Sequence, residues 1–396
     1  MRDKLTRLTI KNFRSLANIT IDLNDINVLF GSNGSGKSTF LDTIWFIRDC
    51  AINGVESASS SRSHGIGACW DGADEGANIS ITVETQQVQY EVLFGYSGGR
   101  IEPYVGEKLI LKTHDNLCLI DRKMGSEQAK FYLSASNSPE FLPVTLKEPE
   151  KLAFSRYIDF KDSMEQANDL DRLLHFVHSY HARSTNLYRL KTRGSDSSHQ
   201  TVLWDRGENL WSVLNNLNHK IKVDADQRYD KIIEFMRESF PGFNDIILEQ
   251  TGPTTIYGSF LDKRLRQPIF ASGVSDGHLQ MLLNLTALFS EGKNRDSLIL
   301  FDEPETSLHP WAIAVFAKAV KLAAETWNKQ IFIATHSPVL MSQFDPEHIL
   351  ETSVDETGQT VIRRLNEIPE IQDLLKDYAV GSLYMAELIA PQSKPY

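Results

Sequence analysis

The sequence predicts an α/β fold with a core lobe on a parallel sheet, a lobe of antiparallel strands and a helical insertion. Three features predict it. Near the N-terminus, an apolar run leads through a glycine-rich loop into a segment with helical spacing, over residues 26–50. Short alternating segments follow, as is typical of antiparallel strands. Near the C-terminus, two apolar runs separated by a helical segment are typical of buried strands.

The N-terminal elements are expected to be strands and one helix. Strands are predicted at LTRLTIKNF, ITIDL and INVLF, and the helix at KSTFLDTIWFIRDC. Residues 53–78 are rich in Gly, Ser and Asn, and we expect a loop there. Four further short strands are predicted at ISITVET, VQYEVLFGY, KLILKT and LCLID, which would form the antiparallel lobe.

The second half of the chain mixes helices and strands. Helical spacing covers residues 164–182 and 208–240, and NDIILE, TTIYGSF and RQPIF are typical of strands. A helix from Val274, a strand at SLILFDE, a helix from about Leu308 and a strand at IFIAT follow. We expect one composite domain over residues 1–396, in which 161–243 is the helical insertion between 1–160 and 244–396.

Composition excludes several classes of protein. Of 396 residues, 41 are Lys or Arg and 52 are Asp or Glu, a net charge of −11 that argues against a broadly basic nucleic-acid coat. Three cysteines without CxxC spacing exclude a disulfide scaffold and a thiolate zinc site. No apolar run is long enough to span a bilayer, and the N-terminus lacks the apolar core of a signal peptide. We expect a cytoplasmic protein.

A phosphate-binding loop is predicted at Gly31–Ser38, GSNGSGKS, which matches G-x-x-x-x-G-K-[ST]. Glycines let the backbone curl so that successive N–H groups point at phosphate oxygens, and the following helix adds its positive N-terminal end. Lys37 would reach the terminal phosphates, and the Ser38 hydroxyl would bind Mg²⁺. The flanking strand and helix favour this interpretation over a chance glycine turn.

An acidic pair follows the apolar run LILF: Asp302 and Glu303. A buried strand that delivers Asp302 to the mouth of a phosphate loop has the geometry needed to hold Mg²⁺. Glu303 could then act as the general base for the attacking water. A strand that simply ends in acidic residues is common, so the pair gains its weight from the phosphate loop that precedes it.

Four further segments resemble the RecF/SMC/OLD branch of ABC-type ATPases. Ser272–His278, SGVSDGH, resembles the signature loop in that branch's S-D-G form, and Ile331–Pro338, IFIATHSP, resembles its switch-histidine segment. Glu305–Pro310 is similar to the D-loop, and Ile10–Ser15 is similar to the opening strand. The motifs stand in the family's order at both ends of the chain, whereas the middle matches only loosely. Gln86, Gln87 and Gln89 are equal candidates for the glutamine of the Q-loop.

The resemblance implies a P-loop ABC-ATPase head that binds ATP and Mg²⁺ and dimerises on ATP. Glu303 and His336 would be catalytic, Ser38 and Asp302 would hold the metal, and Ser275 and Gly277 would close over the γ-phosphate of the other protomer. Further nucleotide contacts are expected from Arg14, Asn33, Gly34, Gly36, Lys37, Ser38 and Thr39. Two alternatives remain open: His336 as a helix-capping or core residue, and Ser275 as an ordinary N-cap.

Function beyond ATP hydrolysis stays open between three classes. No sustained heptad occurs, which excludes a long coiled coil, and only 60 residues follow His336, without D-x-D, so we expect any nuclease to be a separate protein. The chain would then be the sensor or scaffold of an effector, as in two-component bacterial anti-phage systems. The alternatives are a RecF-like ATPase acting directly on DNA and, less favoured, a transporter's nucleotide-binding subunit.

Two clusters in the middle of the chain could carry additional chemistry. A basic stretch could bind a phosphate backbone, although a solvated face explains it more simply; it contains Arg183, Arg189, Lys191, Arg193 and Arg206, with a smaller group at Lys263, Arg264 and Arg266. Histidines recur three apart at His175, His178 and His181, but without a carboxylate or cysteine nearby in the sequence a zinc site is disfavoured.

Overall fold

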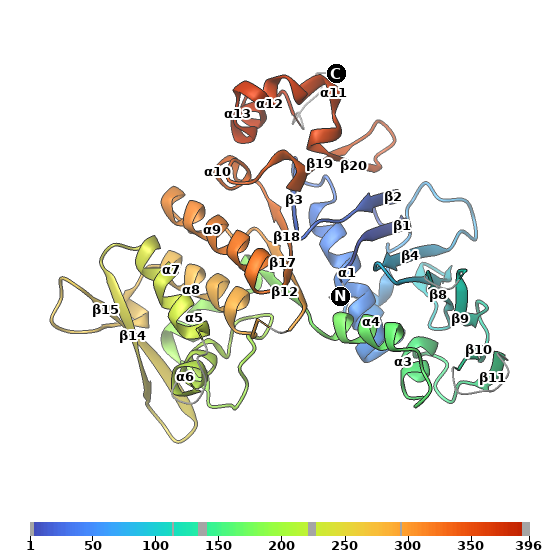
Figure 1. Cartoon of the computed structure of the whole chain (residues 1–396), viewed down its shortest axis with the longest axis horizontal. Helices are drawn as coiled ribbons and strands as arrows, with labels where there is room; N and C mark the ends of the chain where they lie inside the picture. The colour runs from blue at the N-terminus through green and yellow to red at the C-terminus, as the bar shows by residue number, and fades with distance from the viewer. Residues whose placement is uncertain (1–3, 113–114, 134–140, 221–226, 294, 390–396) are drawn as a thin grey trace. The chain divides into compact units, whose positions relative to one another are not determined.

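The computed structural model describes residues 4–112, 115–133, 141–220, 227–293 and 295–389. The chain forms two compact units, each assembled from separate stretches of sequence. The first unit comprises Met1–Asn24, Gly31–Val177 and Glu351–Arg363; the second comprises Asp25–Phe30, His178–Leu350 and Arg364–Tyr396. Figure 1 labels the helices and strands.

The first unit is built on an eight-stranded antiparallel sheet in the order β11-β10-β9-β8-β5-β4-β1-β2. Its strands are β1 (Arg7–Phe13), β2 (Leu16–Asp22), β4 (Ile79–Glu84), β5 (Val88–Phe94), β8 (Gly106–Leu111), β9 (Leu117–Arg122), β10 (Gln128–Tyr132) and β11 (Phe141–Thr145). Alternation is clearest in β5, where every second residue is buried. This unit also contains β6 (Tyr96–Ser97), β7 (Arg100–Ile101), α2 (Val55–Ser60), α3 (Ala153–Ile158) and α4 (Glu165–His175).

Helix α1 (Lys37–Asn53) packs on this sheet through an aromatic core. The Phe46 ring stacks against Phe13 of β1 at a centroid distance of 5.7 Å and against Phe94 of β5 at 5.1 Å. All three rings are buried. The helix that follows the phosphate loop is therefore anchored on the sheet, which holds its first turn in a fixed place.

A fully buried ion pair crosslinks the same unit. Arg122 of β9 donates to Glu107 of β8 at 3.0 Å, and both side chains have no solvent exposure. Glu107 also accepts hydrogen bonds from the Tyr90 hydroxyl at 2.8 Å and from the backbone N–H groups of Ala153 and Phe154 at 2.6 and 3.0 Å. The carboxylate thus satisfies N–H groups at the start of α3, which no backbone carbonyl of that helix can reach.

The second unit contains a sheet with the strand order β12-β17-β18-β3. These strands are β12 (Val177–His181), β17 (Ser297–Asp302), β18 (Lys329–Thr335) and β3 (Ile26–Phe30). Strands β17, β18 and β3 are parallel, so Asp302, Thr335 and Phe30 end them at the same edge. The continuous apolar runs of the sequence fit this arrangement, because β18 and β3 are buried along their whole length.

Helices α7, α8 and α9 lie side by side against this sheet (Figure 1). Their buried faces share one apolar cluster in which Phe235 of α7 stacks on Phe289 of α8, and Phe289 meets Trp327 at the end of α9. Of these three helices, α7 spans Arg228–Ser239, α8 spans Asp276–Phe289 and α9 spans Pro310–Thr326. The unit also contains the helices α5 (Leu187–Thr192), α6 (Leu210–Lys220), α10 (Pro338–Met341), α11 (Pro369–Gln372), α12 (Leu374–Asp377) and α13 (Val380–Met385). A small sheet is formed by β13 (Ser195–Asp196), β14 (Phe243–Gln250), β15 (Thr255–Asp262) and β16 (Ile269–Phe270). The hairpin β19 (Ile349–Val354) and β20 (Thr360–Arg364) belongs mostly to the first unit. Among the described residues, no helix is long and apolar enough to cross a membrane.

Two expectations from the sequence are wrong in detail. The helix expected over 164–182 ends at His175, and the segment VHSYH forms β12 beside β17, where Val177 and Tyr180 are buried. Pairing with a neighbouring strand outweighs the local helical spacing there. The loop expected over 53–78 contains α2, because Val55 and Ala58, three apart, bury one face of a short helix.

Candidate nucleotide site

The phosphate loop Gly31–Ser38 leads from the end of β3 into α1, and two of its glycines occupy positions that exclude a side chain. Gly36 has a φ of +97°, and a Cβ there would lie 2.3 Å from Thr360 Oγ1. At Gly31, with a φ of +154°, a Cβ would lie 1.9 Å from the carbonyl oxygen of Thr352. The loop therefore packs so closely against the β19–β20 hairpin that only glycine fits.

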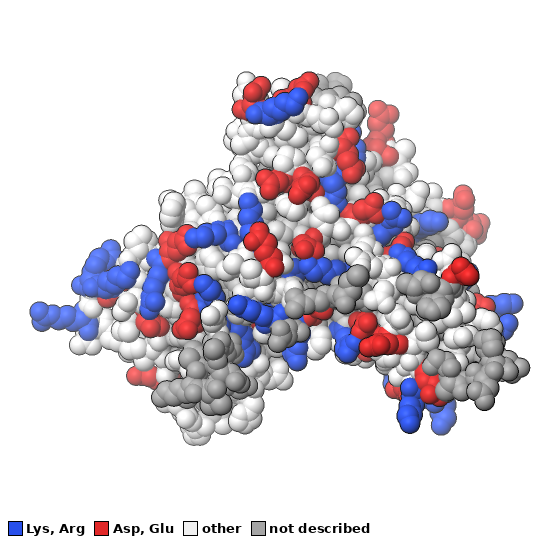
Figure 2. Space-filling model, viewed as in Figure 1, with Lys and Arg blue, Asp and Glu red and all other residues white. Residues whose placement is uncertain are grey.

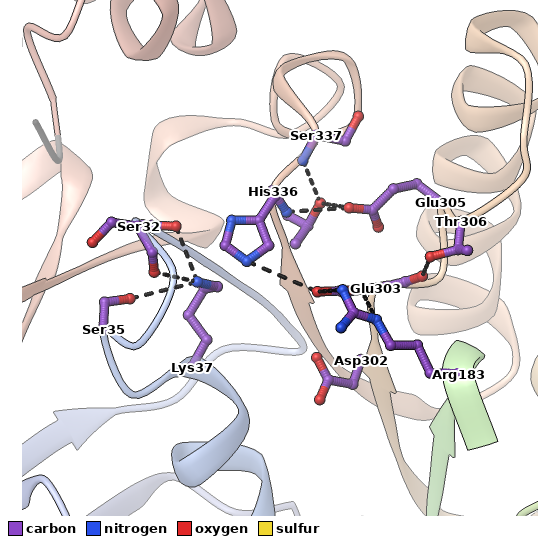
Figure 3. A network of polar contacts seen from close by, with 12 residues as sticks. Ser32, Ser35, Lys37, Arg183, Asp302, Glu303, Glu305, Thr306, His336 and Ser337 are labelled. Carbon is purple, nitrogen blue, oxygen red and sulfur yellow. Dashed lines mark hydrogen bonds and ion pairs between the residues drawn. The ribbon is translucent and has the colours of Figure 1, made fainter. Parts of the chain in front are cut away.

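Lys37 is folded over the loop to which it belongs. Its Nζ donates to the carbonyl oxygens of Gly31 at 3.0 Å and Ser32 at 2.8 Å and lies 3.5 Å from Ser35 Oγ (Figure 3). The side chain is buried. A cation withdrawn from water in this way attracts an anion more strongly than an exposed lysine does, because less solvent screens the charge.

The first turn of α1 is suited to an anion. Its N-cap is Gly36 in the left-handed conformation, it has no side-chain cap, and no acidic residue lies in the turn. The first N–H groups of a helix have no partner within that helix, and its dipole places positive charge there. Ser38 is exposed and Thr39 half-buried on this turn, while Asn33 and Gly34 are exposed in the loop.

Arg14 lies beside the same helix. Its Nη1 pairs with Asp42 of α1 at 3.0 Å, and Asp42 also receives Arg62 Nε at 2.8 Å. Arg62 in turn pairs with Asp49 at 2.9 Å. Two arginines are thus fixed along α1 by carboxylates of the helix, and the role of Arg14 in nucleotide binding stays a prediction.

The acidic pair stands at the end of β17 in the second unit. Glu303 has a φ of +54°, a left-handed backbone that costs a non-glycine residue about 1–2 kcal/mol. Its N–H donates to the Ala334 carbonyl at 2.9 Å, and its own carbonyl accepts from the N–H and Oγ1 of Thr306 at 3.1 and 2.9 Å. Such strain persists only where the surroundings fix it, and it is concentrated at functional sites.

The side chain of Glu303 is held as firmly as its backbone. Arg183 Nε donates to Oε2 at 3.0 Å and Arg183 Nη2 to Oε1 at 3.2 Å, while His336 Nε2 lies 3.9 Å from Oε1 (Figure 3). His181 Nε2 lies 3.7 Å from Asp302 Oδ2. The sequence did not connect Arg183 with the acidic pair, because Arg183 lies 120 residues before Glu303, in a basic stretch that a solvated face explains more simply.

Glu305 organises the switch-histidine segment. Its Oε1 accepts from Thr335 Oγ1 at 2.6 Å and from the N–H of His336 at 3.1 Å, and Thr335 Oγ1 accepts from the N–H of Ser337 at 2.9 Å. Burial raises the pKa of the Glu305 carboxyl above its usual range, with a further contribution from the charge of Glu303. The sequence placed Glu305 in the D-loop but assigned it no role. A second glutamate so soon after Glu303, in the run DEPE, was the feature that could have drawn attention to it.

His336 neither caps a helix nor lies in the core. Ser337 is the N-cap of α10 and accepts from the N–H of Leu340, so the helix-capping alternative for His336 is wrong. The imidazole is about one third exposed, which leaves it accessible from solvent.

The signature loop sits at the start of α8 in the second unit. Ser275 occupies the N-cap position, but its Oγ lies 2.8 Å from His278 Nδ1 and caps no N–H group. His278 stacks on Phe240 with ring centroids 3.8 Å apart, and burial lowers the pKa of its imidazole. At Gly277 a Cβ would lie 2.5 Å from the carbonyl oxygen of Ser307, so the glycine lets the D-loop approach the helix.

Much of the basic stretch is neutralised by carboxylates of the same unit. Arg183 faces Glu303, Arg189 pairs with Asp196 at 2.9 Å, Lys191 pairs with Asp276 at 2.6 Å and Arg264 pairs with Asp262 at 2.6 Å. On the face drawn in Figure 2, basic and acidic side chains are interspersed rather than separated. This distribution is that of a solvated, charge-paired face rather than a continuous phosphate-binding groove.

The three histidines do not converge. His178 Nε2 pairs with Glu291 at 3.1 Å, His175 Nδ1 lies 3.4 Å from Asp171, and His181 faces Asp302. Within the described ranges, no group of three His, Cys, Asp or Glu side chains is placed to hold a metal ion.

Comparison with known proteins agrees with this geometry. Residues 26–342 match the family described as "AAA domain, putative AbiEii toxin, Type IV TA system". The Old nuclease of Escherichia phage P2 is 19% identical over 387 residues, which are 95% of this chain and 63% of that protein. Endonuclease GajA of Bacillus cereus (strain VD045) is 20% identical over 370 residues, 88% of this chain and 58% of that protein. The chain thus spans less than two thirds of either relative.

A solved SMC head, bound in its crystal to the C-winged helix domain of ScpA, has a similar fold. Its TM-score is 0.51 at 13% identity, with 92% of this chain and 98% of that chain covered. The predicted α/β head with a parallel and an antiparallel sheet is confirmed. Because the family model covers most of the chain, the chain belongs to this AAA family, and together with the relatives and the fold this makes it a P-loop ATPase of the RecF/SMC/OLD type.

Proposed function

We propose that the chain binds ATP with Mg²⁺, dimerises on ATP, hydrolyses it slowly and serves as the sensor or scaffold of a separate effector. The observation that carries the proposal is the state of Glu303. A carboxylate held in a left-handed backbone conformation, next to Asp302 and the partly exposed His336, is the arrangement expected of a water-activating base.

The residues of the site fit the proposed ligands. At Gly31 and Gly36 a Cβ would clash with the β19–β20 hairpin, so glycine allows the curled backbone whose N–H groups could bind phosphate oxygens, and Lys37 adds the positive charge. Mg²⁺ prefers hard oxygen ligands, and the Ser38 hydroxyl and the Asp302 carboxylate would supply them. Bound Mg-ATP would supply the γ-phosphoryl group and the cation that offsets its charge.

The chain's own residues would then divide the chemistry of hydrolysis. Glu303 would accept a proton from the attacking water at a carboxylate oxygen. His336, anchored through its N–H to Glu305, would orient its imidazole toward the reacting group. Lys37 and the first-turn N–H groups of α1 would stabilise the charge that develops on the phosphate oxygens.

Dimerisation would bring the signature loop of one protomer to the nucleotide of the other. Ser275 and Gly277 lie in the first turn of α8, where N–H groups and the helix dipole favour an anion. The Ser275 Oγ caps no N–H group of its own helix, and to donate to a phosphate oxygen it would exchange its 2.8 Å contact with His278 Nδ1. Each ATP would then be held by two protomers, and its hydrolysis would release the dimer.

A separate nuclease is the effector that the relatives favour. Two of them are named Old nuclease and endonuclease GajA, and the chain spans 63% and 58% of their lengths. The SMC head shows that a head of this fold can carry a partner protein. The role in anti-phage defence follows from the same resemblance. Direct action on DNA, as in the matched RecF of Shewanella woodyi, is the second candidate, although the charge-paired basic stretch gives it little support.

The test is native mass spectrometry of tagged Glu303→Gln protein, isolated from its own host with Mg-ATP present. The substitution keeps the shape of the side chain and removes the base, so an ATP-bound dimer should accumulate. A second polypeptide at a fixed ratio is the expected result and would define the effector. A bare dimer would favour direct action on nucleic acid, and a monomer with bound ATP would contradict the dimer mechanism.

A further inference from the structure

The segment that follows β12 brings two basic side chains to the two carboxylates of the acidic pair. His181, the last residue of β12, faces Asp302 at 3.7 Å, and Arg183, in the next 3₁₀ turn, contacts Glu303. Because β12 and β17 are neighbours in the sheet, the residues at and just after the ends of the two strands lie close together. No other described ion pair reaches the Glu303 carboxylate except the longer contact from His336.

Arg183 engages both oxygens of Glu303 with a single guanidinium plane. Nε donates to Oε2 at 3.0 Å, and Nη2 lies 2.8 Å from Oε2 and 3.2 Å from Oε1, so two nitrogens of one planar guanidinium reach both carboxylate oxygens. Two hydrogen bonds from one rigid group restrict the rotation of a carboxylate more than a single hydrogen bond does. The backbone of Glu303 is already fixed in the left-handed conformation, so the guanidinium completes the definition of where the carboxylate points.

Arg183 has no comparable role in the packing of the unit. Its side chain is 72% exposed, and ion pairs of exposed side chains contribute little to stability. An exposed arginine that directs two of its nitrogens at one acidic residue is better explained by the function of that residue than by folding.

We propose that Arg183 is a positioning residue for ATP hydrolysis: its guanidinium holds the Glu303 carboxylate in the orientation that accepts a proton from water. The inference rests on the proposed role of Glu303 as the general base. Arg183 acts through Glu303 and contributes nothing to nucleotide affinity. Its removal leaves the carboxylate in place but free to rotate.

The experiment measures kcat and KM for ATP in the full chain for Arg183→Ala, Arg183→Lys, Glu303→Gln and the double variant Arg183→Ala/Glu303→Gln. Arg183→Ala should lower kcat about 10- to 100-fold, the scale of a displaced catalytic group, with KM unchanged. Arg183→Lys keeps the charge but loses the fork, so it should recover part of kcat. The double variant should be no slower than Glu303→Gln, because Arg183 has no other route to the reaction.

Arg237→Ala is the matched control. Arg237 on α7 pairs with Asp245 at 3.5 Å, its Nε donates to the Asn244 carbonyl at 2.6 Å, and its side chain is 45% exposed, so its removal tests the loss of an arginine's surface contacts away from the acidic pair. The control should keep the parent kcat.

The outcomes separate the inference from the function on which it rests. Parent kcat in Arg183→Ala, a rise in KM alone, or a further loss in the double variant would each overturn the positioning role. Parent kcat in Glu303→Gln would instead overturn the proposed base, whatever Arg183 does.

Discussion

The phosphate loop and the acidic pair are both proposed to act on a phosphate group, but the loop is built mainly from backbone and the acidic pair from side chains. The loop is made of backbone: glycines at φ +154° and +97°, a helix N-terminus, and Lys37 bound to carbonyls within six residues of itself. The site around the acidic pair is made of side chains from three separate segments, since Glu303 meets Arg183 and His336, and the backbone N–H of His336 donates to Glu305. A backbone site is local in sequence, and a side-chain site is not.

The difference also predicts how each region tolerates change. At Gly31 and Gly36 an added Cβ would lie less than 2.5 Å from a neighbouring atom, so the loop cannot accept a side chain at these positions. A network of hydrogen bonds, in contrast, can lose one member and keep part of its geometry. Substitutions in the loop should therefore have larger effects than substitutions in the network. The following predictions are ordered by the size of effect we expect.

Lys37→Ala should cause the largest loss. It removes the buried cation of the phosphate loop, so ATP affinity should fall about 100-fold or more, on the scale of a deleted donor to a phosphate in a preorganised site. Isothermal titration with ATP measures the change. Lys318→Ala, an exposed lysine paired with Glu238 on the helical face, is the control and should bind like the parent. Parent affinity in Lys37→Ala would remove the loop from nucleotide binding altogether.

Glu291→Gln should cause the largest loss of stability. Burial alone would raise the pKa of Glu291, but the hydrogen bond and charge of His178 and the charge of Lys329 outweigh it and lower the pKa to about 2. Its folded-state pKa lies below the ordinary 4.5, so the carboxylate contributes stability above about pH 4.5 that is lost as the pH falls toward about 2. Removing one partner of a buried pair costs about 3 kcal/mol at neutral pH.

Denaturant unfolding at several pH values tests this prediction. The parent should lose stability between about pH 4.5 and 2, and Glu291→Gln should be less stable at pH 7 but less sensitive to acid over this range. Glu234→Gln, on the exposed face of α7, is the control and should follow the parent curve. A Glu291→Gln curve parallel to the parent's would show that this carboxylate does not titrate abnormally.

Gly36→Ala and Gly34→Ala should differ, although both glycines have positive φ. An added Cβ at Gly36 meets Thr360 Oγ1 at 2.3 Å, whereas at Gly34 it meets nothing within 4 Å. Gly34→Ala should lower the free energy of unfolding by only about 1 kcal/mol, because its Cβ is strained by the left-handed backbone alone. Gly36→Ala should lower thermal stability by more than this and should also lower ATP affinity. Equal effects in both variants would mean that the β19–β20 hairpin moves to make room for the added Cβ at Gly36.

Glu305→Ala should have the smallest effect of the set. It removes the acceptor of Thr335 Oγ1 and of the His336 N–H, so we expect kcat to fall about tenfold, the scale of one or two lost hydrogen bonds. Glu305→Gln retains an acceptor oxygen and should stay near the parent. Steady-state ATP hydrolysis separates the two, and an equally slow Glu305→Gln would indicate a role for the carboxylate's charge instead of its geometry.

The same contrast explains what the sequence could predict. The phosphate loop, the acidic strand end and the apolar strands were identified because each depends on neighbours within a few residues. Arg183, Glu305 and His278 acquired roles only in the structure, since their partners lie 120, 30 and 3 residues away. The contact between His278 and Ser275 could not be predicted although the two residues are only three apart, because it joins two side chains and not the backbone.

The helix that proved shorter than expected teaches the same lesson. Residues 165–175 keep their helical spacing, but VHSYH becomes β12 because a place beside β17 exists in the sheet. That strand is what carries His181 and Arg183 to the acidic pair. A local pattern could not reveal it, because the deciding partner is about 120 residues further along the chain.

Mixing two inactive variants tests the central claim, a nucleotide held between the phosphate loop of one protomer and the signature loop of another. Lys37→Ala disables the loop, and Ser275→Glu places a negative charge where the partner's γ-phosphate would bind while remaining compatible with a helix N-terminus. Each variant alone should be inactive. An equal mixture should regain about a quarter of the parent's ATP hydrolysis, because half of randomly paired dimers contain one intact site of two. A mixture as inactive as its components would contradict the shared site.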